Sequence, residues 1–285
     1  MIRKRIKNLK DYGFNTSHRT YIIAEIGLNH GGDVDVAKSL IDSAVRAGAD
    51  AVKFQTYLTE KRAPKGHQAI FDILKKCELP FDAFKELKDY TEQYEVEFFS
   101  TAFDLESLEY LESIGCSLYK VASFDVANHK LLAEVASAGK PVILSVGMSN
   151  LGEIEEALNI LKKGTDNIAL LHCISAYPTK EEDANLGAIY TLQDQFDCVI
   201  GLSDHTSGIK VPLYAVAAGA QIIEKHFKID ENIDCVDSPV SISEAQMRQM
   251  VKEIRRIESI FGGGEFGVRK AERDVTIFRR FSEIK

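Results

Sequence analysis

Short apolar runs alternate with longer amphipathic segments along most of the chain. From Tyr21 onward, eight runs rich in β-branched, aromatic and aliphatic residues predict strands. They are YIIAEIG, AVKFQTY, EFFSTAF, LYKVAS, PVILSVG, IALLHCI, CVIGLSD and QIIEKHF. Each is followed by a stretch with helical periodicity, such as VDVAKSLIDSAVRAGA after the first and LGEIEEALNILKKG after the fifth. Strands that are almost entirely apolar indicate parallel strands covered by helices.

Eight strand and helix units over roughly 250 residues predict an α/β fold, a (β/α)8 TIM barrel formed by a single domain. The alternative is an open doubly wound sheet, which often carries GxGxxG at its first turn, where this chain has GLNHGGD. A later cluster, GGGEFG, follows a predicted helix, so we interpret it as a helix stop and linker. We expect an N-terminal arm at 1–20, the barrel at 21–261 and a C-terminal linker or tail at 262–285.

Composition narrows the class of protein further. The 285 residues are 45% hydrophobic and carry a net charge of -8, which argues against a nucleic-acid partner because phosphate contacts need clustered Lys and Arg. The basic start, MIRKRIKNLK, lacks the apolar core of a signal peptide, and no run approaches the ~20 apolar residues of a membrane span. Five widely spaced cysteines without a CxxC pair indicate reduced thiols. We therefore expect a cytoplasmic protein without a membrane partner.

Polar residues interrupt the predicted strands near their carboxyl ends, which form the functional face of such a barrel. Lys53, Lys120 and Glu224 lie inside otherwise apolar runs, where an unpaired charge would cost several kcal/mol. Residues two apart on a strand share a face, so Glu224 and His226 point the same way, and Lys225 then points outward with a structural role. The other polar residues near these ends include Glu25, Gln55, Thr101, Ser123, Asp125, Ser145, Ser175, Tyr177, Ser203 and His205.

Two lysines directed into one barrel mouth suit a phosphate, or a phosphate together with a carboxylate. The alternative is that one lysine forms a Schiff base with a carbonyl substrate. The second lysine and a ring of hydroxyl groups favour anion binding. These hydroxyl groups belong to Thr101, Ser123, Ser145 and Ser203.

Two histidines end consecutive strands of the predicted barrel. Neighbouring parallel strands lie about 4.8 Å apart, so His205 and His226 could hold one divalent ion between them. With Glu25 or Asp237 nearby and open positions for water, such a ligand set suits manganese, iron or zinc better than calcium. The alternative is that both are hydrogen-bonded core residues, which is also an interpretation for His172 on the preceding strand.

Motifs along the whole predicted barrel resemble those of the sialic acid synthase family. In order they are EIGLNHGGD, AGADAVKFQTY, STAFD, YKVAS, SVGM, AYPT, GLSDHT and EKHF, spanning residues 25–227. Enzymes of this family condense phosphoenolpyruvate with an open-chain N-acetylated aminohexose, which gives a nonulosonic acid and phosphate. The resemblance therefore implies a transferase with two small-molecule substrates, and a homodimer as the usual assembly.

The resemblance also implies roles for individual residues. Phosphoenolpyruvate would be held by Lys53, Thr101, Lys120, Ser123, Ser145, Ser175 and Ser203. The sugar would be contacted or activated by Glu25, Gln55, Asp125, Tyr177, Glu224 and Asp237. His205 and His226 would bind a divalent metal, Mn²⁺ in the first place, with Mg²⁺ or Co²⁺ as alternatives.

The chain departs from the family pattern in four places. Ser175 stands where Asn is frequent, Val146 where Thr is common, and Ser238 where the motif after the eighth strand has His. Many members also carry a C-terminal antifreeze-like domain that contacts the sugar's N-acetyl group, and we expect this domain to be absent. Two alternatives follow: a 3-deoxy sugar-acid synthase using a non-acetylated aldose or aldose phosphate, or a non-catalytic barrel module of a larger assembly.

Overall fold

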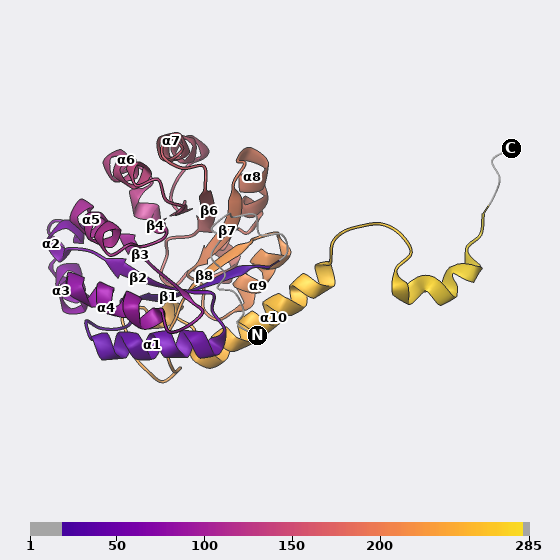
Figure 1. The fold of residues 1–285 in the computed structure, drawn as a ribbon, viewed down its shortest axis with the longest axis horizontal. Helices are drawn as coiled ribbons and strands as arrows, with labels where there is room; N and C mark the ends of the chain where they lie inside the picture. The colour runs from indigo at the N-terminus through magenta and orange to yellow at the C-terminus, as the bar shows by residue number, and fades with distance from the viewer. Residues whose placement is uncertain (1–18, 282–285) are drawn as a thin grey trace.

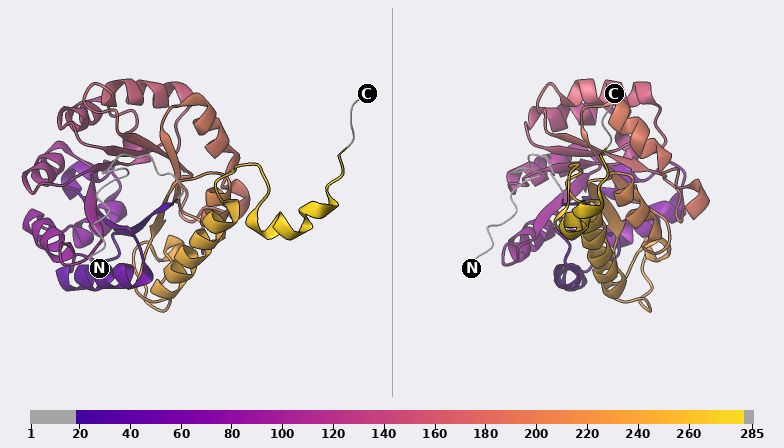
Figure 2. Two further views of the ribbon diagram at one scale, coloured as in Figure 1. Left: turned by 45° about the vertical axis from the view of Figure 1, so that its right-hand side comes forward. Right: turned by 90° about the vertical axis from the view of Figure 1, so that its right-hand side faces the viewer.

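The computed structural model describes residues 19–281, in which eight parallel strands close a barrel in sequential order. Helices surround the barrel (Figures 1 and 2), which confirms the predicted TIM-barrel fold. The strands are β1 (Tyr21–Gly27), β2 (Ala51–Thr56), β3 (Glu97–Ala102), β4 (Tyr119–Val121), β5 (Val142–Ser145), β6 (Ile168–Cys173), β7 (Val199–Asp204) and β8 (Ile222–His226). The α-helices are α1 (Val34–Ala47), α2 (Thr59–Arg62), α3 (Gln68–Cys77), α4 (Phe81–Thr91), α5 (Leu105–Ser113), α6 (His129–Ser137), α7 (Leu151–Leu161), α8 (Gly187–Gln195), α9 (Lys210–Ala217) and α10 (Glu244–Phe261).

All eight predicted strands are present. The largest differences are at β4 and β5, which end two residues before the last residue of the predicted runs LYKVAS and PVILSVG. After β4 the chain turns into a short 3₁₀ helix, η1 (Ser123–Asp125), so the last residue of LYKVAS leaves the strand. The connection between β2 and β3 also differs from a simple strand and helix unit, because it contains α2, α3 and α4.

The apolar core has two layers that follow from the alternation of strand side chains. In β1, Ile22, Ala24 and Ile26 pack against the helices, whereas Ile23 points into the barrel. The residues that fill the lower part of the barrel are Tyr21, Ile23, Ala51, Phe99, Leu118, Ile143, Ala169, Leu171 and Ile222. A polar residue two positions after one of these points into the barrel above the apolar layer.

Lys225 points away from the barrel interior, as predicted, and forms a buried ion pair. Its Nζ lies 2.6 Å from Asp204 Oδ2, and the two side chains are 0% and 2% exposed. The same ammonium group donates to the carbonyl oxygen of Thr206. Burial lowers the pKa of Lys225, and Asp204 opposes that shift. This ion pair links β7 to β8 on the outer side of the barrel.

Removing the lysine of this pair should destabilise the barrel. Lys225→Met leaves the Asp204 carboxylate buried without its counter-ion, and we expect the free energy of unfolding to fall by about 3–5 kcal/mol. Urea denaturation measures this loss. Lys85→Met, at an exposed i,i+4 pair with Asp89, is the control and should change stability by less than about 0.5 kcal/mol. Equal stability of the two variants would contradict the structural role of Lys225.

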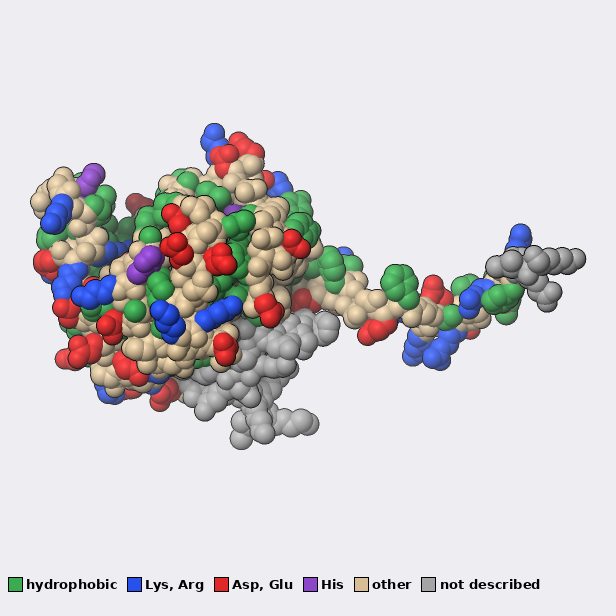
Figure 3. All heavy atoms as spheres, turned by 90° about the horizontal axis from the view of Figure 1, so that it is seen from above, with side chains coloured by type: hydrophobic (Ala, Val, Ile, Leu, Met, Phe, Trp, Pro, Cys, Tyr) green, Lys and Arg blue, Asp and Glu red, His purple; other side chains and the backbone are tan. Residues whose placement is uncertain are grey.

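The chain leaves the barrel after α10. Gly262 ends this helix with φ 59°, so the GGGEFG cluster is a helix stop as predicted. A tail with a 3₁₀ segment, η4 (Lys270–Phe278), then extends away from the barrel and carries hydrophobic and basic side chains (Figures 1 and 3). No helix among residues 19–281 is both long enough and apolar enough to cross a membrane. Residues 1–18 of the predicted N-terminal arm lie outside the described residues.

Candidate active site

The carboxyl ends of the strands surround a pocket with an empty volume of about 460 Å³. Most of the residues predicted from sequence line it, although they come from seven of the eight strands and the loops that follow them. They are Glu25, Lys53, Gln55, Thr101, Lys120, Ser123, Ser145, Ser175, Tyr177, Ser203, His205, Glu224 and His226. The barrel therefore brings residues from most of the chain into one site.

Strand register explains why these side chains meet at one level. Glu25 of β1 lies opposite Lys53 on one side and His226 on the other. Thr101 of β3 lies opposite Lys120 of β4. The apolar layer lies two positions before Glu25, Lys53, Thr101 and Lys120 on their strands, so a polar layer forms directly above a packed hydrophobic floor, and His226 reaches this level through its register with Glu25. The floor excludes water from below, which strengthens electrostatic interactions within the layer.

Lys53 lies at the centre of this layer between two carboxylates. Its Nζ is 2.8 Å from Glu25 Oε2, 3.8 Å from Glu224 Oε2 and 3.0 Å from the hydroxyl oxygen of Thr101. Burial lowers the pKa of Lys53, but Glu224 and Glu25 outweigh burial and the pKa is raised overall. Lys53 is therefore a fixed cation.

Lys120 has different neighbours, although it also lies inside an otherwise apolar strand, as Lys53 does. Its Nζ donates to the hydroxyl of Ser145 at 2.7 Å and to the carbonyl of Val121 at 2.9 Å. No carboxylate oxygen of the described residues lies within 4.0 Å of Lys120 Nζ, so this lysine forms no ion pair among them. Burial lowers the pKa of Lys120, and Glu224 compensates only in part. This ammonium group is available to an anionic ligand.

The two buried carboxylates are pushed toward opposite protonation states. Burial raises the pKa of Glu25 despite the nearby Lys53, while Gln55 donates to its Oε1 at 2.7 Å. Burial also opposes ionisation of Glu224, but Lys120 and Lys53 outweigh it and lower the pKa to about 2. Such a split assigns different roles to two carboxyl groups. Glu25 is the candidate for proton transfer, and Glu224 is a permanent anion that positions the lysines.

The raised pKa of Glu25 gives a prediction for pH dependence. If ionised Glu25 accepts a proton in the reaction, kcat should fall on the acid side at a pH above the ordinary glutamate value of 4.5. Glu25→Gln should remove this limb of the profile and reduce kcat by about 10²–10⁴-fold. A pH series of initial rates measures both. An unchanged acid limb in Glu25→Gln would assign the titration to another group.

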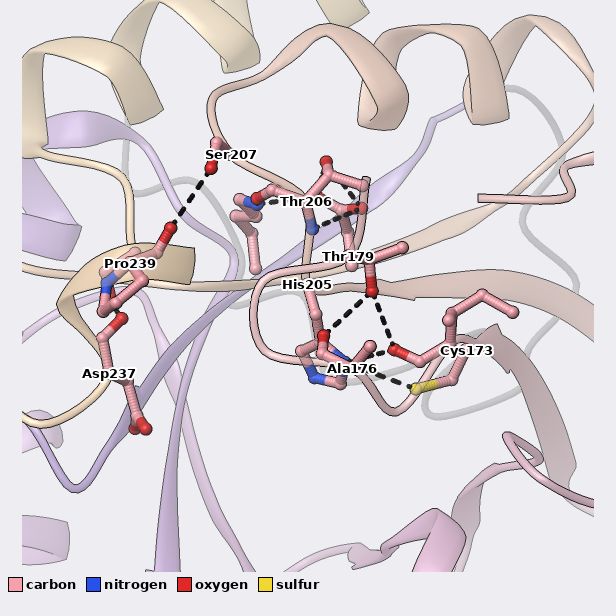
Figure 4. A network of polar contacts seen from close by, with 12 residues as sticks. Cys173, Ala176, Thr179, His205, Thr206, Ser207, Asp237 and Pro239 are labelled. Carbon is pink, nitrogen blue, oxygen red and sulfur yellow. Dashed lines mark hydrogen bonds and ion pairs between the residues drawn. The ribbon is translucent and has the colours of Figure 1, made fainter. Parts of the chain in front are cut away.

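His205 and His226 lie together at the mouth, with ring centroids 5.4 Å apart. His205 Nδ1 is 2.8 Å from the carbonyl oxygen of Ile174, so this nitrogen donates and Nε2 keeps its lone pair. The thiol of Cys173 lies 3.7 Å from the same Nδ1 (Figure 4). The ring of Tyr177 covers the pair, with its centroid 4.1 Å from that of His205 and 5.9 Å from that of His226.

Asp237 orients the second histidine from outside the pocket lining. Its Oδ2 lies 3.3 Å from His226 Nδ1 and also accepts from the amide of Leu28 at 3.3 Å. Burial lowers the pKa of His226, but Asp237 outweighs burial and the pKa is raised. The close approach requires glycine at position 27, where φ is 56° and a Cβ would lie 2.8 Å from Asp237 Oδ2.

The histidine pair fits a divalent ion with open coordination positions. Among residues 19–281, no group of three or more His, Cys, Asp or Glu side chains is arranged to hold a metal. His205 presents the lone pair of Nε2, and the Nδ1 of His226 faces a carboxylate, the outer contact that metal-bound histidines usually make. Two imidazoles with water or substrate oxygens suit a transition-metal ion.

Two predicted site residues, Asp125 and Asp237, lie outside the pocket lining, and five lining residues were not predicted. Asp125, in η1, accepts from the side-chain amide of Asn128 at 2.9 Å. The polar pattern at the strand ends did not identify Arg62, Phe103, Ala122, Phe124 or Cys173 as lining residues. Arg62 was missed because it lies in the charged segment TEKRAP, six residues beyond β2, where nothing in the sequence distinguishes it from its neighbours.

A family model, curated proteins and a solved structure all match this chain over most of its length. The NeuB family model matches residues 40–266. An N,N'-diacetyllegionaminic acid synthase of Campylobacter jejuni is 39% identical over 279 residues, covering 92% of this chain and 84% of that protein. An uncharacterized protein of Methanocaldococcus jannaschii is 46% identical over 266 residues, covering 93% and 79%. The crystal structure of an N-acetylneuraminic acid synthetase from Leptospira borgpetersenii, in complex with citrate, superposes with a TM-score of 0.89 at 41% identity and covers 92% of this chain and 91% of that one. The chain therefore belongs to the NeuB family, which confirms the resemblance to sialic acid synthases seen in its motifs.

Proposed function

We propose that the protein condenses phosphoenolpyruvate with an N-acetylated aminohexose, forming a nonulosonic acid and releasing phosphate. The observation that carries this proposal is the presence, in one pocket, of two buried lysines beside a pair of histidines. The lysines suit an anionic donor, and the histidines suit an ion that binds a sugar carbonyl. Relatives named as synthases of legionaminic, pseudaminic and N-acetylneuraminic acid derivatives support the same reaction.

Phosphoenolpyruvate would lie on the polar layer above the apolar floor. Lys120 would bind it directly, since no carboxylate in the part of the chain that the structure describes pairs with this ammonium group. Lys53, fixed between Glu25 and Glu224, would supply the second charge. Hydroxyl donors would complete the binding site and hold C3 of the enol toward the acceptor. These donors are Thr101, Ser123, Ser145, Ser175 and Ser203.

The sugar acceptor would lie on the histidine side of the pocket. His205 and His226 would hold Mn²⁺, with Mg²⁺ and Co²⁺ as alternatives. When bound, this ion supplies Lewis-acid polarisation of the sugar aldehyde. Tyr177 packs against both imidazoles and would bound the acceptor site. Gln55 and Asp237 would contact the sugar hydroxyl groups.

The reaction balances without a covalent link to the protein. C3 of phosphoenolpyruvate attacks the aldehyde carbon, which forms the new carbon–carbon bond and leaves positive charge at C2. Water adds at C2, and Glu25 accepts its proton, which passes to the oxygen of the former aldehyde. The tetrahedral intermediate then breaks the bond between C2 and the bridging oxygen, the C2 hydroxyl loses its proton to the leaving phosphate, and C2 becomes the ketone of the product as inorganic phosphate is released. No Schiff base is needed, so both lysines serve charge and position.

A panel of acceptors tests the proposed function. Phosphate release would be measured with phosphoenolpyruvate, Mn²⁺ and one sugar at a time: mono-acetamido hexoses, di-acetamido hexoses, the matching non-acetylated aldoses and aldose phosphates. We expect release to depend on an acetamido sugar. The relatives that make N,N'-diacetyllegionaminic acid favour the di-acetamido members. Preference for non-acetylated aldoses would favour the 3-deoxy sugar-acid alternative, and no sugar-dependent release would favour a non-catalytic module.

A further inference from the structure

Arg62 is a cation at the rim of the pocket that the reaction described above does not use. It ends α2, the short helix above β2, and lines the pocket with Gln55 and Tyr177. Its guanidinium carbon lies 4.4 Å from the ring centroid of Tyr57 and 3.9 Å from that of Phe103. Two aromatic faces therefore fix the position of the guanidinium group.

The charge of Arg62 is unpaired within the part of the chain that the structure describes. Within residues 19–281, no carboxylate oxygen approaches it within 4.0 Å, and its Nη1 is buried without a hydrogen-bond partner. The neighbouring Lys61 differs, because it forms an ion pair with Glu106 outside the pocket. A buried guanidinium nitrogen without an acceptor is costly and calls for a ligand. Arg62 is therefore held in place by two aromatic rings, while its Nη1 lacks a hydrogen-bond acceptor among the described residues.

The depth of Arg62 indicates which substrate it meets. Lys53 and Lys120 are each 3% exposed and lie on the strands, at the level where the donor anion would bind. Arg62 ends helix α2, which follows β2, so it lies beyond the two lysines toward the entrance. Its charge also contributes to lowering the pKa of Asp237, which contacts His226 on the acceptor side. A sugar whose aldehyde faces the histidines would extend from the polar layer toward this rim.

We propose that Arg62 is a specificity-determining residue that donates from Nη1 to an oxygen of a substituent on the sugar acceptor. Resting on the proposed function, this inference names the acceptor group as an acetamido carbonyl or a phosphate, both of which offer strong acceptor oxygens to a guanidinium group. Tyr57 and Phe103 position Arg62 before the sugar arrives, so little side-chain entropy is lost on binding. Arg62 would then select substituted sugars over plain aldoses.

The test compares Arg62→Met, Arg62→Lys and the matched control Lys61→Met. Methionine keeps an unbranched apolar chain against the two rings and removes the charge. Saturation curves for the preferred acceptor should show KM raised about 10–100-fold in Arg62→Met, with KM for phosphoenolpyruvate and kcat within about twofold of the wild type. Lys61→Met should match the wild type, because it removes one positive charge from the same helix outside the pocket. Arg62→Lys should recover part of the lost affinity.

The choice of acceptor distinguishes the two groups that Arg62 could bind. If it binds the acetamido carbonyl, the KM ratio of Arg62→Met to wild type should approach one for the aldose lacking that group. If it binds a phosphate, the ratio should be large only for the phosphorylated sugar. Unchanged acceptor KM across the panel would overturn the inference, as would a raised KM for phosphoenolpyruvate alone.

Direct binding separates this inference from the proposed function. Titration calorimetry would follow phosphoenolpyruvate binding to the wild type and then acceptor binding to that complex. A wild type that turns over sugar while Arg62→Met binds the acceptor equally well overturns only the role of Arg62. A wild type that binds neither substrate overturns both proposals.

Discussion

Lys53→Met is expected to reduce kcat/KM for phosphoenolpyruvate by about 10²–10³-fold. The variant removes the ammonium group that lies 2.8 Å from Glu25 and 3.8 Å from Glu224. The donor anion would then face two buried carboxylates with Lys120 as the remaining cation of the polar layer. Loss of Lys53 also removes a charge that lowers the pKa of Glu224, so that pKa should rise. Initial rates of phosphate release against donor concentration measure the effect.

Lys225→Met is the control for this result. Lys225 is also a buried lysine on a barrel strand, but its ion pair with Asp204 lies outside the pocket lining. The control should lose stability, and its folded fraction should keep the KM of the wild type for phosphoenolpyruvate. Lys53→Met with wild-type kcat and KM would show that the polar layer does not bind the donor.

His205→Ala and His226→Ala are each expected to lose the bound divalent ion and to lower kcat by at least about 10²-fold. Either change leaves one imidazole of a pair whose ring centroids are 5.4 Å apart. Metal content after dialysis against Mn²⁺, measured by plasma emission spectrometry, gives a readout that does not depend on turnover. Activity with added Mn²⁺ gives the second readout.

His172→Gln is the matched control for the histidine pair. His172 is also buried on a strand, but its Nε2 bonds the carbonyl oxygen of Ala184 at 2.8 Å, and it does not line the pocket. This variant should keep both metal and activity. If the double variant His205→Ala with His226→Ala kept its metal content and its activity, the ion would have to bind elsewhere.

The barrel could be predicted because the alternation of an apolar run and a helical segment repeats eight times along the chain. Eight apolar runs with helical segments between them leave few other arrangements, and the alternation of strand side chains already placed Glu224 and His226 on one face, where both line the pocket. The prediction of strand ends was less accurate at β4, because Ser123 belongs to the predicted run but begins a 3₁₀ helix in the structure. Backbone conformation there depends on contacts between loops, which local sequence does not encode.

The candidate site was predictable where side chains sit on strands, and less so elsewhere. Strand alternation placed Lys53 and Glu224 in the barrel, but it could not show that Lys53 pairs with carboxylates while Lys120 has no such pair among the described residues. That difference depends on register between strands far apart in sequence. Arg62 had no periodic signal at all, because its place at the rim is set by stacking on Phe103, 41 residues further along the chain.

The most direct test of the proposed function follows the bridging oxygen of phosphoenolpyruvate. The substrate would carry ¹⁸O between C2 and phosphorus, and mass spectrometry would locate the label after reaction with Mn²⁺ and the preferred acetamido sugar. We predict sugar-dependent turnover with the label in inorganic phosphate, because the C2–O bond breaks, and a product heavier than the sugar by a three-carbon acid unit. Label retained in the sugar acid would contradict cleavage of that bond, and label release without added sugar would contradict the condensation itself.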